Sequence, residues 1–132
     1  MSHFTTVKTK IKNLTCLITA LEELGLEYNV AEAEQMVRVR GYRGNEELAE
    51  LCITVSEKYD IGLRLTASGE YEMIADWSEL EDLIDTESFI DKLTQRYAYH
   101  TVMEQIKTQG FTMDQTETEA DGTIRIKVST WQ

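Results

Sequence analysis

The chain has 132 residues, of which 42% are hydrophobic, and its formal net charge is -11. This size and apolar content predict one folded domain over residues 1–132 and exclude a disordered chain. No apolar run approaches the roughly 18 residues of a membrane span, and the N-terminus lacks the pattern of a secretion signal. The acidic balance disfavours nucleic acid and anionic membranes as partners.

The first part of the chain predicts a strand followed by a helix. Apolar side chains and lysines alternate over residues 3–11, which is typical of a half-buried strand. Asn13 is a suitable N-cap for a helix with apolar residues at helical spacing up to Leu24, and Gly25 can end that helix. Residues 26–35 fit either a short strand or an acidic turn.

The middle of the chain predicts an antiparallel meander. Residues 36–40 alternate and end in a glycine-containing turn at residues 41–45. Three more strand-like segments follow, at residues 51–55, 61–66 and 71–75, and their connections are too short for parallel crossovers.

The last part of the chain predicts two helices and a hairpin. Ser78 with Glu81 fits a capping box for a short acidic helix, and a longer helix begins at Thr86 or Ser88. After Gly110, residues 111–117 and 123–131 form a hairpin. The predicted fold is α+β, a single domain with an antiparallel or mixed sheet of about six strands and two main helices packed on one face.

Most of the basic residues share the polar side of their predicted strands. If the helices cover one face of a single sheet, the other face is open and basic. Its members are Lys8, Lys10, Lys12, Arg38, Arg40, Arg64, Arg125 and Lys127. These side chains either cover an open sheet with their heads in water, or form a surface for an acidic protein partner or another copy of the chain. RNA binding is disfavoured, because aromatic side chains are not interleaved with the lysines.

The longer helix contains the segment richest in reactive side chains, Gln95–Val102. Arg96, His100 and Glu104 are spaced four residues apart and so share one helix face. Glu104 is placed to orient His100 for acid–base chemistry. However, no nucleophile, oxyanion donor or metal set accompanies them, so a structural, hydrogen-bonded His100 is the favoured interpretation.

Two tyrosines in this segment, Tyr97 and Tyr99, cannot both face the core. Tyr97 continues the apolar stripe of the helix from Leu93, so we expect it to point inward. Tyr99 is then the candidate for exposure or for a partner contact.

The turn at residues 38–45 contains three arginines and two glycines. Guanidinium groups and turn N–H groups both suit phosphate, yet the segment matches no phosphate-binding motif. The turn is therefore either an ordinary strand ending or an anion site. In the second case its ligands are Arg40, Tyr42 and Arg43, joined by Arg96, Tyr99 and His100 if the turn and the helix converge in one pocket.

Other site chemistry is not indicated. Cys16 and Cys52 are two isolated cysteines, which we expect to be ordinary reduced thiols. His3 and His100 lack a third ligand at motif spacing, so no metal is predicted. We expect no cofactor and no catalytic residue, and the chain is expected not to be an enzyme.

Several separated segments resemble one known family. They are Met1–Phe4 leading into Lys8–Leu14, Val39–Gly44, Tyr59–Gly62, Gln95–His100 and the pattern from Asp121 to Trp131. Together they resemble the hypothetical chloroplast reading frame thirty-five family, which occurs in plastid genomes of algae and in cyanobacteria. Residues 26–36 depart from that pattern in being longer and more acidic.

The resemblance implies a cyanobacterial cytoplasm or a chloroplast stroma as the setting, and it implies no activity. The leading functional hypothesis is a small non-enzymatic interaction or regulatory protein with a basic sheet face for an acidic partner. The alternative is an anion- or phosphate-ligand-binding protein, with weak catalysis at most, built around Arg40, Arg43, Arg96 and His100.

Overall fold

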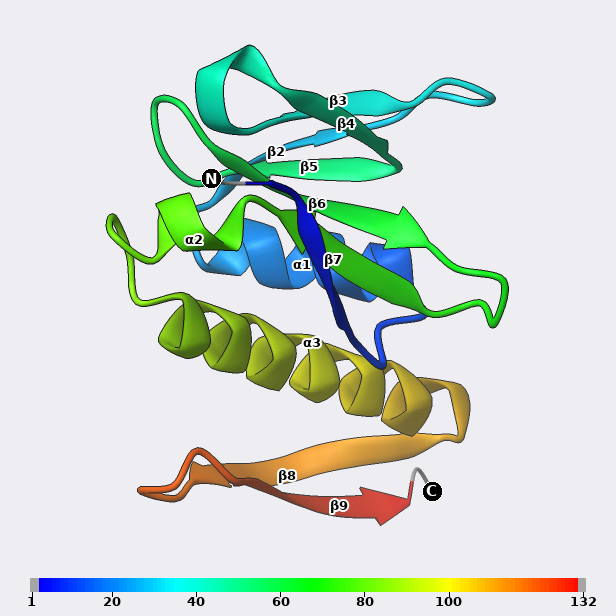
Figure 1. Ribbon diagram of the computed structural model, residues 1–132. Helices are drawn as coiled ribbons and strands as arrows, with labels where there is room; N and C mark the ends of the chain where they lie inside the picture. Colours follow the sequence, from blue (N-terminus) through cyan, green and yellow to red (C-terminus); the bar gives the residue numbers. More distant parts are fainter. Residues whose placement is uncertain (1–2, 131–132) are drawn as a thin grey trace.

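The computed structural model describes residues 3–130, without the side chains of residues 111–116 and 128–130. Within this range nine strands form three antiparallel sheets, accompanied by two main helices (Figure 1). The strands are β1 (Thr5–Lys8), β2 (Glu27–Val30), β3 (Val37–Arg40), β4 (Glu46–Ala49), β5 (Leu51–Thr54), β6 (Asp60–Leu65), β7 (Tyr71–Ala75), β8 (Phe111–Thr118) and β9 (Ile124–Thr130). The helices are α1 (Leu14–Glu23), α2 (Trp77–Leu80) and α3 (Thr86–Thr108), with a 3-10 turn η1 (Tyr42–Gly44).

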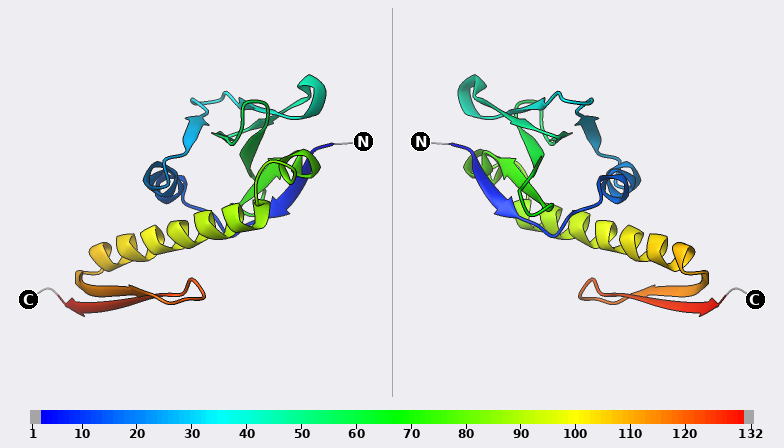
Figure 2. Two further views of the ribbon diagram at one scale, coloured as in Figure 1. Left: turned by 90° about the vertical axis from the view of Figure 1, so that its left-hand side faces the viewer. Right: turned by 90° about the vertical axis from the view of Figure 1, so that its right-hand side faces the viewer.

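The central sheet has five strands in the order β1-β7-β6-β5-β2, and every neighbouring pair is antiparallel. Helices α1 and α3 pack on one face of this sheet, and the β3–β4 hairpin lies over the other face (Figure 2). The predicted α+β class, with two main helices on one face, is confirmed. The central sheet is smaller than expected because β3–β4 and β8–β9 pair as separate two-stranded sheets.

Strand β6 shows how this arrangement follows from the alternation of side chains. Ile61 and Leu63 point toward the helices and belong to the main core. Gly62 points the other way, where a Cβ atom would lie 2.5 Å from Cγ2 of Val39 in the hairpin. The missing side chain therefore lets the hairpin approach the sheet closely.

Three predicted helix ends agree with the structure. Asn13 Oδ1 accepts the Cys16 N–H at 3.1 Å, which caps α1 as expected. Gly25 ends α1 with a φ of 71°, a value that glycine adopts without steric cost. Helix α3 begins at Thr86, the first of the two predicted starts, because Asp85 caps the Ser88 N–H at 3.0 Å.

Some element boundaries differ from the prediction. The first strand ends at Lys8 and not at residue 11, because the Thr9 hydroxyl binds the carbonyl of Tyr71 and accepts the Ile11 N–H. The short acidic helix α2 begins after Asp76, so the Ser78 capping box is wrong.

Two strands, β2 and β4, lie in segments for which the sequence pattern made no clear prediction. The ambiguous residues 26–35 contain strand β2, and Glu46–Ala49 is an additional strand that the glycine-rich turn before it obscures. The C-terminal hairpin is confirmed as β8–β9, while its predicted last residue, Trp131, lies outside the described residues. No helix in residues 3–130 combines the length and apolar character needed to cross a membrane.

Candidate functional site

Arg40 is held by the buried carboxylate of Asp60. Its Nε donates to Asp60 Oδ2 and its Nη2 to Asp60 Oδ1, both at 2.9 Å. Nη1 donates to the Glu57 carbonyl at 2.7 Å, and Nη2 also reaches the Ser56 carbonyl at 3.1 Å. The hydrogen bonds that Arg40 donates to the Asp60 carboxylate raise the pKa of Arg40. This guanidinium joins β3 to β6.

The glycine-rich turn η1 is also part of the packing. A Cβ atom at Gly41 would lie 2.6 Å from Cζ of Phe4, so the Phe4 ring needs that glycine. The Tyr42 N–H donates to Oδ2 of Asp76 at 3.1 Å, and Asp76 is buried. These contacts connect the β3–β4 hairpin to β1 and to the start of α2.

A hollow of about 530 Å³ lies beside η1 and includes Arg40, Tyr42 and Arg43 in its lining. The Arg43 guanidinium lies 5.1 Å from the centre of the Tyr42 ring, and Lys58 lines the hollow as well. These three predicted ligands therefore come together, although the charge of Arg40 is already matched by Asp60.

The other predicted ligands, Arg96, Tyr99 and His100, lie between α1 and α3. Arg96 Nη2 donates to Glu23 Oε2 at 2.8 Å and its Nε contacts Oε1 of the same carboxylate. The hydrogen bond from Arg96 lowers the pKa of Glu23. The Tyr99 ring is packed under the Arg96 guanidinium at 4.3 Å and meets the His100 ring edge-on, with centroids 5.1 Å apart.

His100 faces the Glu23 carboxylate but is not oriented by Glu104. Its Nε2 lies 3.4 Å from Glu23 Oε2, in a direction that gives no hydrogen bond, and this buried nitrogen has no other hydrogen-bond partner in the part of the chain that the structure describes. Glu104 instead accepts from Cys16 Sγ at 2.9 Å and from Asn13 Nδ2 at 3.4 Å. The expected Glu104–His100 pair is wrong, because one helical turn along α3 brings each side chain to a different part of α1.

Tyr97 points inward as predicted. Its hydroxyl oxygen accepts the N–H groups of Lys12 at 2.9 Å and Asn13 at 3.0 Å. These are backbone donors at the start of α1, where the helix itself supplies no acceptor. Tyr97 therefore ties α3 to the segment that connects β1 with α1.

The turn and the helix do not converge in one pocket. The β3–β4 hairpin and η1 lie over one face of the central sheet, whereas α3 packs on the opposite face (Figures 1 and 2). The combined anion site of Arg40 and Arg43 with Arg96 and His100 is therefore wrong in its geometry, because five paired strands separate the two groups.

The basic residues do not form a single open sheet face either. Arg38 lies in the hairpin sheet and Arg125 and Lys127 in the β8–β9 sheet, so they belong to different sheets from Arg64. Arg64 points under the hairpin and pairs with Glu72 at 3.1 Å and with Glu47 of β4 at 3.8 Å. The predicted basic face is wrong as a continuous surface, because the hairpin covers that side of the central sheet.

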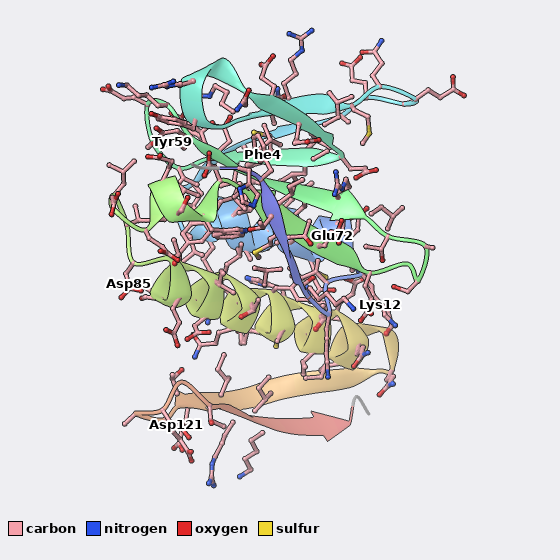
Figure 3. All side chains as sticks on the ribbon, viewed as in Figure 1. Phe4, Lys12, Tyr59, Glu72, Asp85 and Asp121 are labelled. Carbon is pink, nitrogen blue, oxygen red and sulfur yellow. The ribbon has the colours of Figure 1, made fainter. Side chains whose placement is uncertain are left out.

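Three of the predicted basic residues remain together. Lys8, Lys10 and Lys12 are exposed and line two adjoining hollows between the β1–α1 connection and α3, with volumes of about 560 and 370 Å³. The hollows share Lys10, Tyr97 and Thr101, so they form one groove along α3. We call it the lysine groove. Figure 3 shows Lys12 beside the C-terminal part of α3.

The lining of the lysine groove combines exposed lysines and apolar side chains with two carboxylates, Glu70 and Glu104. Ile11, Ile90 and Ala98 line the larger hollow. Among the ion pairs of the described side chains, none includes Lys8, Lys10 or Lys12. The arrangement can therefore receive a segment that is negatively charged at its edges and apolar in its middle.

Neither cysteine lines this groove. Burial raises the pKa of Cys16 to about 11 and that of Cys52 to about 12, so both thiols are protonated at neutral pH. The described residues contain no cluster of His, Cys, Asp and Glu side chains suited to a metal ion.

The sequence does not single out the carboxylates that organise these contacts. Asp60 and Asp76 stand next to turns, where acidic residues are common. Only the position of Asp60 could have drawn attention, because it is the first residue of the apolar strand β6. A carboxylate buried at such a position requires a charged or hydrogen-bonding partner. Glu23 has no such signal, since it belongs to an acidic helix end that looks exposed.

These observations define a small α+β protein with two internal ion-pair clusters and one lysine-rimmed groove. The chain belongs to the family described as "Protein of unknown function (DUF1257)", whose model matches residues 20–127.

Relatives in three algae are similar over the whole length. The "Uncharacterized protein ycf35" of Pyropia yezoensis is 32% identical over 131 residues, covering 99% of this chain and 98% of the relative. The proteins of the same name from Guillardia theta and Cyanophora paradoxa are each 30% identical, covering 100% of this chain and 99% of theirs. The resemblance to the chloroplast reading frame thirty-five family is confirmed. No solved structure matches the chain significantly.

Proposed function

We propose that this protein is a small non-enzymatic interaction protein whose lysine groove binds an acidic segment of a protein partner. We place this interaction in the cyanobacterial cytoplasm or the chloroplast stroma, the setting that its family suggests. The observation that carries the proposal is the group of Lys8, Lys10 and Lys12, exposed and without ion pairs among the described side chains, at the rim of an apolar groove.

The contrast between the groove lysines and the acidic charge of the whole chain supports an acidic segment as the occupant of the groove. The whole chain carries a net charge of -11, so an acidic partner is repelled by most of its surface. A local cluster of three exposed lysines on this acidic chain then favours one orientation of approach for an acidic partner. The apolar floor formed by Ile11, Ile90 and Ala98 adds contact area that charge alone does not give.

Two arginine ion pairs elsewhere in the fold favour the lysine groove as the binding site over an enzymatic site at these arginines. Arg40 is committed to Asp60, and Arg96 to Glu23. Their charges are thus matched inside the fold, whereas the groove lysines have no such match among the described side chains.

The proposal can be tested with a defined peptide. A labelled peptide of interspersed glutamates and leucines is titrated with the protein at low salt, and binding is followed by fluorescence anisotropy. We expect saturable binding that weakens at high salt, since salt screens the contact. The same peptide with glutamine in place of glutamate is expected not to bind.

A variant with Lys8→Glu, Lys10→Glu and Lys12→Glu should lose the binding. The matched control reverses Lys58, Lys92 and Lys127, which are exposed, do not line the groove, and change the net charge by the same amount. Equal loss in both variants would show that only the overall charge matters, and the groove proposal would then be abandoned.

A further inference from the structure

The protein carries its own acidic segment with an exposed apolar side chain. The connection between α2 and α3 contains Glu81 and Asp82, both exposed, followed by Leu83, which is 55% exposed. Backbone hydrogen bonds from Leu83 N and Ile84 N to the Leu80 carbonyl, each 2.9 Å long, hold this connection in an ordered turn. The segment is therefore already ordered in the single chain, and its immobilisation on binding costs little conformational entropy.

We infer that the occupant of the lysine groove is the Glu81–Leu83 segment of a second copy of this chain. The inference rests on the proposed groove function and names its partner. Glu81 and Asp82 of one copy face Lys10 and Lys12 of the other, and Leu83 lies on the apolar floor. This assignment matches two features of the groove, which are the lysines on its rim and the apolar residues of its floor.

The contact must be made between copies. Asp85, which follows the segment and caps α3, lies at one end of this helix, and Lys12 lies beside the other end (Figure 3). A helix of this length spans about 35 Å at 1.5 Å per residue, so the segment cannot reach the Lys12 end of its own groove. A two-fold pair in which the α3 helices run antiparallel brings each segment to the partner's groove, giving two identical contacts.

Charge-reversal variants test the inference by their oligomeric state, measured by analytical ultracentrifugation over a range of protein concentrations. Wild type should form a dimer as concentration rises. The groove variant Lys10→Glu/Lys12→Glu and the segment variant Glu81→Lys/Asp82→Lys should each dimerise at least about tenfold more weakly, because like charges now face each other.

The segment variant is informative because it makes the chain less acidic than its net charge of -11. General repulsion between copies falls in this variant, so weaker dimerisation must come from the lost contact itself. The variant Leu83→Ser keeps every charge and should also weaken the dimer, since it removes the apolar part of the contact. Asp85 is left unchanged because it caps α3.

The decisive variant combines both reversals in one chain. Lys10→Glu/Lys12→Glu/Glu81→Lys/Asp82→Lys has the net charge of wild type and exchanges the signs on the two sides of the contact. It should dimerise again. An equimolar mixture of the groove variant and the segment variant should also form a mixed dimer, because one of its two contacts has the wild-type charges and the other has both signs exchanged. Circular dichroism of each variant checks that it is folded.

The outcomes separate this inference from the proposed function. A wild-type protein that stays monomeric but binds the acidic peptide overturns the second-copy inference and leaves the groove function standing. A monomer that also fails to bind the peptide overturns both. A dimer that survives in the segment variant places the dimer contact elsewhere and rejects the inference.

Discussion

The guanidinium of Arg40 and the carboxylate of Asp60 form a bidentate salt bridge that joins the β3–β4 hairpin to the central sheet. Both hydrogen bonds are 2.9 Å long, and Oδ2 of Asp60 also accepts the backbone N–H of Arg40 at 2.8 Å. Asp60 is only 3% exposed. The contact joins two segments that lie 20 residues apart in the chain.

Replacing Arg40 by Ala should destabilise the fold strongly. The substitution leaves the Asp60 carboxylate buried without a cation, a change that costs 3–5 kcal/mol in fully buried pairs. Because the Arg40 side chain is 41% exposed, water can replace part of the contact, and we expect a loss of about 2–3 kcal/mol. Urea unfolding measures this difference.

Arg38 in the same strand provides the control for Arg40. Its side chain is 73% exposed and pairs with Glu46 at 3.4 Å. Arg38→Ala should change the free energy of unfolding by less than about 0.5 kcal/mol. Similar losses at both positions would contradict a special role for the Arg40–Asp60 pair.

Gly62→Ala tests the close approach of the hairpin to the central sheet. The new methyl group would meet Val39 Cγ2 at 2.5 Å and Ala49 Cβ and Ile74 Cγ2 at 3.0 Å. Overpacking of this kind costs about 1–3 kcal/mol. The second change Val39→Ala removes the nearest obstacle, so the double variant should lose less stability than the sum of the two single variants. Simple additivity in urea unfolding would show that Val39 is not the obstacle.

The contact of Glu23 with Arg96 predicts a pH dependence of stability. Arg96 holds the folded-state pKa of Glu23 below its ordinary value of 4.5, so the unfolded chain binds a proton at higher pH than the folded one. The stabilisation is therefore present above about pH 4.5 and is lost as the pH falls through the lower folded-state pKa. Because the side chain is 38% exposed, we expect less than about 1 kcal/mol.

The variant Glu23→Gln measures this contribution. The free energy of unfolding of the variant should fall less steeply than that of wild type as the solution is acidified below pH 5. Glu32→Gln is the control, since Glu32 is exposed and enters no ion pair among the described side chains. An identical acid profile for wild type and Glu23→Gln would refute the linkage.

The two cysteines should react slowly in the folded protein. Thiolates are the reactive form, and burial is the main reason why the pKa values of Cys16 and Cys52 are about 11 and about 12. A thiol reagent at neutral pH should label both residues much faster in denaturant than in buffer. Rapid labelling of the native protein, followed by mass spectrometry, would contradict this placement.

Several elements of the fold depend on local chemistry and could be predicted from the sequence. Asn13 and Gly25 mark the two ends of α1 because capping and a left-handed residue are properties of a few neighbouring positions. The alternation in β5, β6 and β7 indicated an antiparallel meander for the same reason. The resemblance to the chloroplast reading frame thirty-five family, which rested on several separated segments, is also confirmed by the relatives.

The tertiary structure alone decided how these elements meet. Alternation in a strand shows that two faces differ, yet it does not show that the β3–β4 hairpin covers the second face of the central sheet. For that reason Arg64 is half-buried beneath the hairpin, while Lys8, Lys10 and Lys12 are exposed at the lysine groove. Asp60 and Glu23 acquired their roles through partners 20 and 73 residues away, and such distant pairings follow from the packing of the whole chain and from no local pattern.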